Sequence, residues 1–82
     1  MYSAMRVDSV TYDSIYVIFN KYLVTKSDGI REIDVDRNYE SESEAIYIED
    51  LKAMYSDKTI YRVKRGLGAE LKLYWEHLTG GD

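Results

Sequence analysis

The sequence predicts an α+β fold in which an antiparallel sheet of four or five strands packs against one central helix. Several short stretches are rich in β-branched and aromatic residues, which is typical of strands. One stretch in the middle of the chain spaces its apolar residues as a helix does. Short segments containing Asp, Ser and Gly separate these stretches and supply turn chemistry. A chain of 82 residues corresponds to one small domain, residues 1–82.

The first half of the chain predicts strands. Residues 5–10 alternate weakly, as in a short strand, and residues 12–14 are typical of a turn. Residues 15–25 fit either a helical stripe or one face of a strand. Their composition favours a strand, and apolar groups on both faces indicate a central one. Residues 26–29 predict a hairpin turn with Gly29 at positive φ, and residues 30–36 a returning strand whose Ile33 and Val35 face the core.

The second half predicts the helix and two more strands. Ser41 and Glu44 fit a capping box, which predicts a helix from there to about Tyr55. Its apolar stripe contains Tyr47, Ile48, Leu51, Met54 and Tyr55, and Ile46 falls outside that stripe. Residues 59–64 alternate as a strand, and residues 66–68 form a turn. Residues 71–76 also alternate and favour a final strand, although a short helix fits them too.

Composition bounds the location of the protein. The chain has no Cys, which excludes disulfides and thiolate metal sites. Its longest apolar run covers residues 15–19, far too short to cross a membrane. No basic stretch precedes an apolar one near the first residue, as a secretory signal requires. We therefore expect a cytoplasmic protein with no membrane partner.

Catalytic and cofactor chemistry find little support in the sequence. General acid–base catalysis near neutral pH most often uses His, and the chain has only His77. No nucleophile lies beside a recognisable base. Residues 66–68 lack the spacing of either glycine-rich nucleotide motif. We expect no enzymatic activity, no catalytic residue and no cofactor.

One segment resembles the start of a calcium-binding loop. Asp34, Asp36 and Asn38 occupy the first three ligand positions of an EF-hand. The sixth position, which requires Gly, is Tyr39, and the twelfth, which requires Glu, is Ala45. We therefore expect no metal site.

The charges are distributed unevenly. Residues 28–50 contain nine acidic and two basic residues, whereas residues 58–72 contain five basic and one acidic. Carboxylates in a first helical turn complement the helix dipole, which accounts for Glu42 and Glu44. The excess over that role fits two interpretations: a row of carboxylates that imitates nucleic-acid phosphates and binds a basic protein cleft, or charge that keeps a small domain soluble. The candidate partner-binding residues are Asp28, Glu32, Asp34, Asp36, Glu40, Glu42 and Glu44.

The basic segment offers an alternative site. Tyr61 stands beside Arg62, Lys64 and Arg65, so that cations can contact phosphates while an aromatic ring stacks on a base. A nucleic-acid-binding or regulatory protein would use these four residues. These charges can instead balance the acidic residues and line the solvent face of a strand. The net charge of −4 favours that interpretation, because nucleic-acid binders usually carry a dominant basic surface.

The stretch SDGIREIDVDRNYESESEAIYIEDLKAMYSD, residues 27–57, resembles the small acidic anti-CRISPR inhibitors encoded by phages. The shared pattern is a DG turn, an acidic strand, a Ser/Glu-rich junction and a short helix. The resemblance implies an inhibitor that occupies the basic DNA-binding groove of a CRISPR effector or a related nuclease. Its partner would be the basic surface of that nucleic-acid-handling protein, contacted through carboxylates or, since a net charge of −4 is modest for such a mimic, through Tyr-rich apolar surface.

Overall fold

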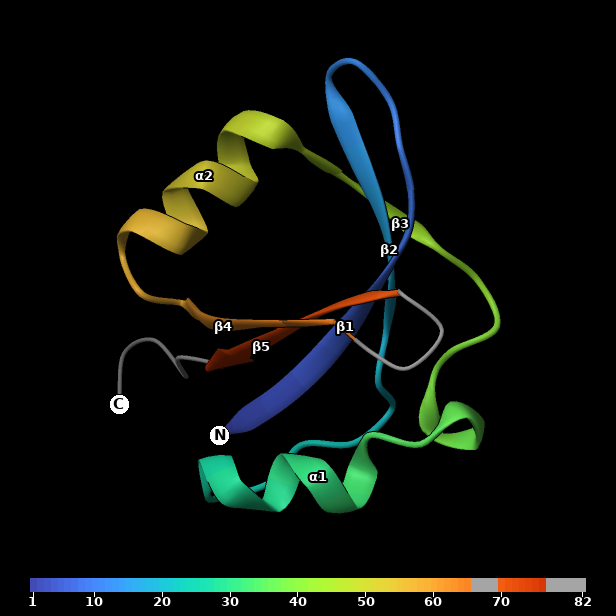
Figure 1. Ribbon diagram of the computed structural model, residues 1–82, viewed down its shortest axis with the longest axis vertical. Helices are drawn as coiled ribbons and strands as arrows, with labels where there is room; N and C mark the ends of the chain where they lie inside the picture. The colour runs from blue at the N-terminus through green and yellow to red at the C-terminus, as the bar shows by residue number, and fades with distance from the viewer. Residues whose placement is uncertain (66–69, 77–82) are drawn as a thin grey trace.

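The computed structural model describes residues 1–65 and 70–76. Within them, a five-stranded antiparallel sheet is combined with two short α-helices (Figure 1), which confirms the α+β class. The strands are β1 (Tyr2–Val10), β2 (Ser14–Phe19), β3 (Glu44–Tyr47), β4 (Ile60–Arg65) and β5 (Leu71–Glu76). The helices are α1 (Ile30–Ile33) and α2 (Ile48–Ser56), with 3₁₀ turns η1 (Ser27–Gly29) and η2 (Asp36–Asn38). The prediction of one central helix is only partly correct, because two short α-helices are present in the described residues.

The sheet has the order β3-β2-β1-β5-β4, with α1 on one face and α2 on the other (Figure 1). Neighbouring residues of each inner strand point to opposite faces, so two separate apolar clusters form. The cluster on the α1 face contains Ala4, Ile18, Ile30, Tyr39 and Tyr74. The cluster on the α2 face contains Met5, Val17, Ile60 and Leu73, with Leu51 and Met54 of α2 packed against it. The helices therefore bury the two faces independently.

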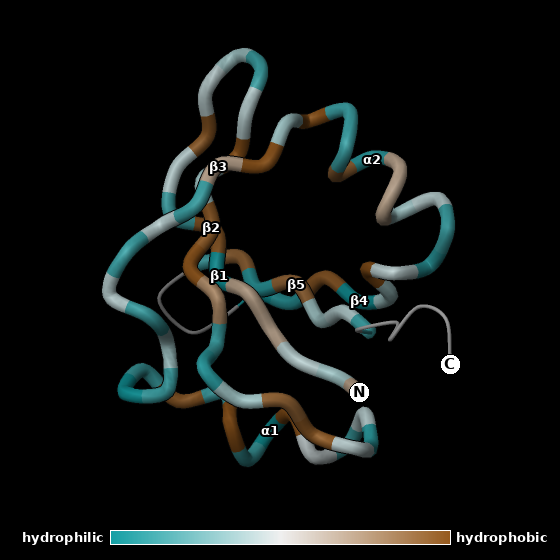
Figure 2. Tube along the Cα trace, turned by 180° about the vertical axis from the view of Figure 1, so that it is seen from behind, coloured by the Kyte–Doolittle hydropathy of each residue, from teal (hydrophilic) through white to brown (hydrophobic). Residues whose placement is uncertain are grey.

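Strand β2 confirms part of what residues 15–25 predict. Val17 and Ile18 belong to different clusters, so the strand is apolar on both faces. It lies between β1 and β3, while β1 takes the middle position of the sheet. The strand ends at Phe19 because the side chain of Asn20 accepts the backbone N–H of Tyr22 and turns the chain. Figure 2 shows the hydrophobic stretch along β2.

The predicted hairpin and strand over residues 26–36 are wrong. This segment forms η1 and α1, and Ile30 rather than Ile33 or Val35 is its fully buried residue. Gly29 has a φ of −73°, so it does not take the left-handed conformation. Gly29 instead allows a close approach to Val24, because a Cβ on Gly29 would lie 3.3 Å from the Cβ of Val24. Ile30 is buried against the α1 face of the sheet. This burial outweighs the local alternation of residues 30–36, which by itself favours a strand.

The predicted capping box is also wrong, because the helix starts four residues later than Glu44. Residues Glu44–Tyr47 pair with β2, with Ile46 opposite Ile15, and so become the edge strand β3. This pairing explains Ile46, which packs against the cluster on the α2 face. Helix α2 has Tyr47 at its N-cap without a side-chain hydrogen bond and ends at Ser56, close to the predicted end.

The last two strands confirm the prediction for residues 59–64 and 71–76. Leu73 lies on the α2 face and Tyr74 on the α1 face, as strand alternation requires. Of the described strands, β4 pairs with β5 alone, and it has a bulge between Ile60 and Arg62. The predicted turn at residues 66–68 and His77 lie outside the described residues. None of the described helices has the length and apolar character needed to cross a membrane.

Candidate functional site

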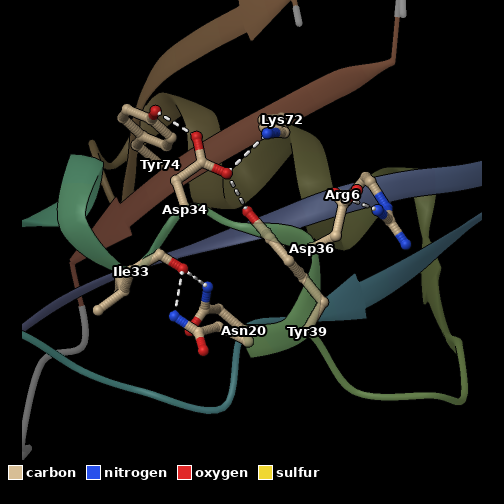
Figure 3. Close-up of polar contacts among 9 residues, drawn as sticks. Arg6, Asn20, Ile33, Asp34, Asp36, Tyr39, Lys72 and Tyr74 are labelled. Carbon is tan, nitrogen blue, oxygen red and sulfur yellow. Dashed lines mark hydrogen bonds and ion pairs between the residues drawn. The ribbon is translucent and has the colours of Figure 1, made fainter.

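A buried carboxylate, Asp34, holds the α1 face of the sheet together (Figure 3). Lys72 Nζ donates to its Oδ1 at 2.7 Å, and the hydroxyl of Tyr39 donates to the same oxygen at 2.7 Å. The hydroxyl of Tyr74 donates to Oδ2 at 2.9 Å. The side chains of Asp34 and Lys72 are only 7% and 12% exposed. A charge buried this far needs such partners.

The three donors set the protonation of this cluster. Burial alone would raise the pKa of Asp34, but hydrogen bonds from Lys72, Tyr39 and Tyr74 outweigh it and hold that pKa below its usual value. Burial and the same carboxylate raise the pKa of Tyr74 to about 12 and that of Tyr39 further still. The cluster therefore keeps an ionised Asp34 and two neutral phenols over the whole physiological pH range.

Asp34 is therefore not available as a partner-binding carboxylate, which corrects the sequence prediction. The expected ladder of alternating carboxylates also disappears, because residues 30–36 are not a strand. Asp36 does face solvent, with a side chain 91% exposed and 3.4 Å from the guanidinium of Arg6. That guanidinium lies 5.2 Å from the ring centre of Tyr39, so Arg6 is oriented by both groups.

The end of α1 is fixed by two asparagines (Figure 3). The side-chain amides of Asn20 and Asn38 donate to the carbonyl oxygen of Ile33 at 2.7 and 3.1 Å. The same carbonyl also accepts the backbone N–H of Val35 at 2.9 Å, so three donors meet at the C-terminal end of the helix. Because α1 carries Arg31, these bonds also position a cation on the surface.

Two of the three basic residues of the sequence prediction line a pocket of about 400 Å³ on the α1 face, between η1–α1 and β4. Tyr61, Arg62 and Lys64 line it together with Arg31 and Tyr74. Tyr61 is held edge-to-face against Tyr2, with ring centres 5.9 Å apart. Ser27 and Asp28 complete the lining. We call this site the basic pocket; Arg65 lies in β4 but does not line it.

The predicted acidic residues are divided among several places. Asp28 lies among the cations of the basic pocket rather than with the other carboxylates, and Glu32 is exposed on α1. Glu40, Glu42 and Glu44 stay together, around a hollow of about 320 Å³ beside Phe19. We call these three residues the acidic strip. Among the residues that the structure describes, no group of three or more His, Cys, Asp or Glu is placed to hold a metal ion.

Sequence reasoning missed Arg31, Tyr39, Lys72 and Tyr74 as members of these two clusters. Lys72 and Asp34 are 38 residues apart, so no local spacing joins them. The sequence does show that Lys72 and Tyr74 alternate with Leu71, Leu73 and Trp75. This alternation predicts that Lys72 and Tyr74 share one face of the strand.

Together, the fold and the pockets define a small α+β domain with a basic pocket near one edge of its sheet and an acidic strip near the other. No protein-family model matches the chain, and neither a curated protein nor a solved structure matches it significantly.

Proposed function

We propose that the protein binds single-stranded nucleic acid in the basic pocket. The observation that carries the proposal is convergence: Arg31 of α1 and Arg62 and Lys64 of β4 line one pocket, and the exposed Tyr61 lines it too. Cations can contact successive phosphates while an aromatic side chain stacks on a base. An open, exposed site of this kind suits a flexible strand better than a small substrate.

The net charge of −4 does not oppose this proposal at short range. Glu44 of the acidic strip is the first residue of β3, and Glu40 and Glu42 come just before that strand. The basic pocket adjoins β4, at the opposite edge of the sheet. Four strand spacings of about 4.8 Å separate those edges by roughly 19 Å. The Debye length at physiological ionic strength is about 8 Å, so the two poles act on a ligand nearly independently.

We predict salt-dependent binding that the basic pocket alone controls. Three phosphate contacts give a slope of log K against log [salt] of about −2 for a single strand. Replacing Arg31, Arg62 and Lys64 by Gln should bring this slope close to zero. Fluorescence anisotropy with a labelled oligonucleotide of mixed sequence, measured from low to physiological salt, gives both values.

The matched control removes the same charge elsewhere. Lys21, Arg37 and Lys58 are exposed and do not line the pocket, so their replacement by Gln should leave the slope unchanged. Equal losses in both triple variants would mean that only net charge matters, and the proposal would then fail.

A second candidate function is the protein-binding inhibitor that the anti-CRISPR resemblance implies. The clustering of Glu40, Glu42 and Glu44 beside an aromatic ring favours it, because carboxylates next to apolar surface suit a basic cleft on a partner. Asp34 has no part in this version, since its carboxylate is engaged by Lys72, Tyr39 and Tyr74.

We predict that reversing Glu40, Glu42 and Glu44 to Lys abolishes inhibition of DNA cleavage by a Cas9-type nuclease loaded with guide RNA, if the wild-type protein inhibits it. Asp8, Glu32 and Asp50 are exposed and lie outside the strip, so their reversal is the control and should preserve inhibition. A wild-type protein without effect on binding or cleavage by such a nuclease rules this candidate out.

A further inference from the structure

Among residues 1–65 and 70–76, strand β4 is an edge strand of the sheet. It pairs with β5 on one side and is the last strand in the sheet order. From Tyr61 onwards every residue of β4 is exposed. An antiparallel edge strand leaves alternate backbone N–H and C=O groups without a neighbour, which makes it a template for a further strand.

The two faces beside this edge have opposite character. On the α1 face, Arg62 and Lys64 project into the basic pocket. On the α2 face, an apolar groove of about 440 Å³ runs between α2 and β4. Val63 and Tyr55 line this groove with 46% and 59% of their surface exposed. Its other lining residues are Ile48, Leu51, Lys52, Ser56, Ile60 and Leu73.

We propose that β4 binds an extended segment of a partner protein in which acidic and apolar residues alternate. The segment adds to the sheet as a sixth strand, held by backbone hydrogen bonds to β4. Because side chains alternate across a strand, its carboxylates face Arg62 and Lys64 while its apolar residues enter the groove beside α2. The bulge between Ile60 and Arg62 limits regular pairing to the stretch that follows it.

Charge selects this occupant over a second copy of the chain. Pairing β4 with another β4 would bring Arg62 and Lys64 of both copies to one edge, where like charges repel. The acidic edge strand β3 does not fit either. Glu44 and Ile46 are two residues apart and share one face, so their strand cannot present acids on one side and apolar groups on the other.

This inference goes beyond nucleic-acid binding and concerns a different kind of partner. Arg62 and Lys64 belong to both sites, so the peptide segment and the nucleic acid exclude each other. Arg31 belongs to α1 and lies only in the basic pocket. Val63 belongs only to the apolar groove. The two partners are therefore separable by substitution.

Direct peptide binding tests the proposal. The probe is a fluorescent eight-residue peptide of alternating Glu and Val, and anisotropy measures its binding to the full chain. We expect it to bind at least about tenfold more tightly than a Lys/Val peptide of the same alternation. We expect the same advantage over a block peptide with four Glu followed by four Val. Equal binding of the block peptide would show charge attraction without strand addition and would overturn the proposal.

Variants of the chain make the test independent of the peptide's own behaviour. The exposed pair Arg62→Glu and Lys64→Glu should reverse the preference toward the Lys/Val peptide without affecting the fold. Arg31→Gln should weaken oligonucleotide binding and leave peptide binding unchanged, whereas Val63→Asp should do the opposite. Unchanged peptide preference in the double reversal refutes the strand proposal alone. Absence of oligonucleotide binding in a chain that binds the peptide refutes the nucleic-acid proposal alone.

Discussion

Replacing Asp34 by Ala is expected to lower the free energy of unfolding by about 3–5 kcal/mol, because it leaves the Lys72 ammonium without its buried counter-ion. Lys72 is 12% exposed and cannot reach solvent freely. Tyr39 and Tyr74 would lose the acceptor of their hydroxyl groups in the same step. A small domain has about 5–15 kcal/mol of stability in total, so this one change removes a large share of it.

Asp36→Ala is the matched control for this prediction. Asp36 is also an acid, two residues away, but its side chain is 91% exposed and its distance to Arg6 is 3.4 Å. A solvent-exposed ion pair of this kind contributes at most about 1 kcal/mol to the free energy of unfolding. Urea unfolding followed by circular dichroism measures both variants. Similar losses for the two changes would contradict the buried network.

The pH dependence of stability gives a second readout for Asp34. Because its folded pKa is lowered, the stabilisation is present above the unfolded value near 3.8 and is lost as pH falls through the folded pKa. The difference between wild type and Asp34→Ala should therefore shrink below about pH 4. Tyr74 acts in the opposite direction: its contribution is complete below pH 10 and is lost as pH rises toward about 12. A difference that is constant between pH 3 and pH 7 would exclude an ionised Asp34 as its origin.

The sequence predicts strands correctly where the residue pattern along the strand reflects burial on its two faces. In β5, Leu73 and Tyr74 point to opposite faces as their pattern predicts, and β2 is apolar on both sides. These strands lie within the sheet, so burial acts on both of their faces and imposes a regular pattern on the residues. The α+β class follows from such strands together with the helical spacing of Leu51 and Met54.

The errors lie where distant contacts overrule a local pattern. Ser41 and Glu44 have the spacing of a capping box, but pairing with β2 draws Glu44 into a strand. Residues 30–36 alternate like a strand, but burial of Ile30 and the bonds of Asp34 favour a helix and a turn. These partners are far away in sequence, so propensity and periodicity contain no trace of them.

The candidate site shows the same limit. The basic pocket was half predicted, since Tyr61, Arg62 and Lys64 are neighbours in sequence, whereas Arg31 joins them only through the fold. The sequence predicts that the acidic residues share one face, but the fold places them in several separate parts of the surface and buries Asp34. A count of charges along the chain detects the two poles but cannot tell a buried carboxylate such as Asp34 from an exposed one.

Ile30→Ala is expected to lower the free energy of unfolding by about 2–5 kcal/mol, the range for large-to-small changes at fully buried positions. Ile30 is 0% exposed and is the only buried residue of α1. Ile33 is half-buried, so Ile33→Ala should cost distinctly less. Urea unfolding of both variants measures the difference. If Ile33→Ala or Val35→Ala proved the more damaging change, Ile30 would not be the residue that anchors this segment to the sheet.

The same substitution connects the core to the proposed function. Ile30 anchors the helix that carries Arg31 into the basic pocket and that has Asp34 as its C-cap. Loosening α1 therefore disturbs the pocket without removing any of its charges. Ile30→Val, which removes one methylene group at a cost of about 0.5–1.5 kcal/mol, should keep the chain folded and still weaken oligonucleotide binding. The slope with salt should then stay near that of wild type while the affinity falls, because the cations remain but are held less firmly in place. An unchanged affinity in Ile30→Val would mean that α1 does not position the site, and that β4 alone provides the phosphate contacts.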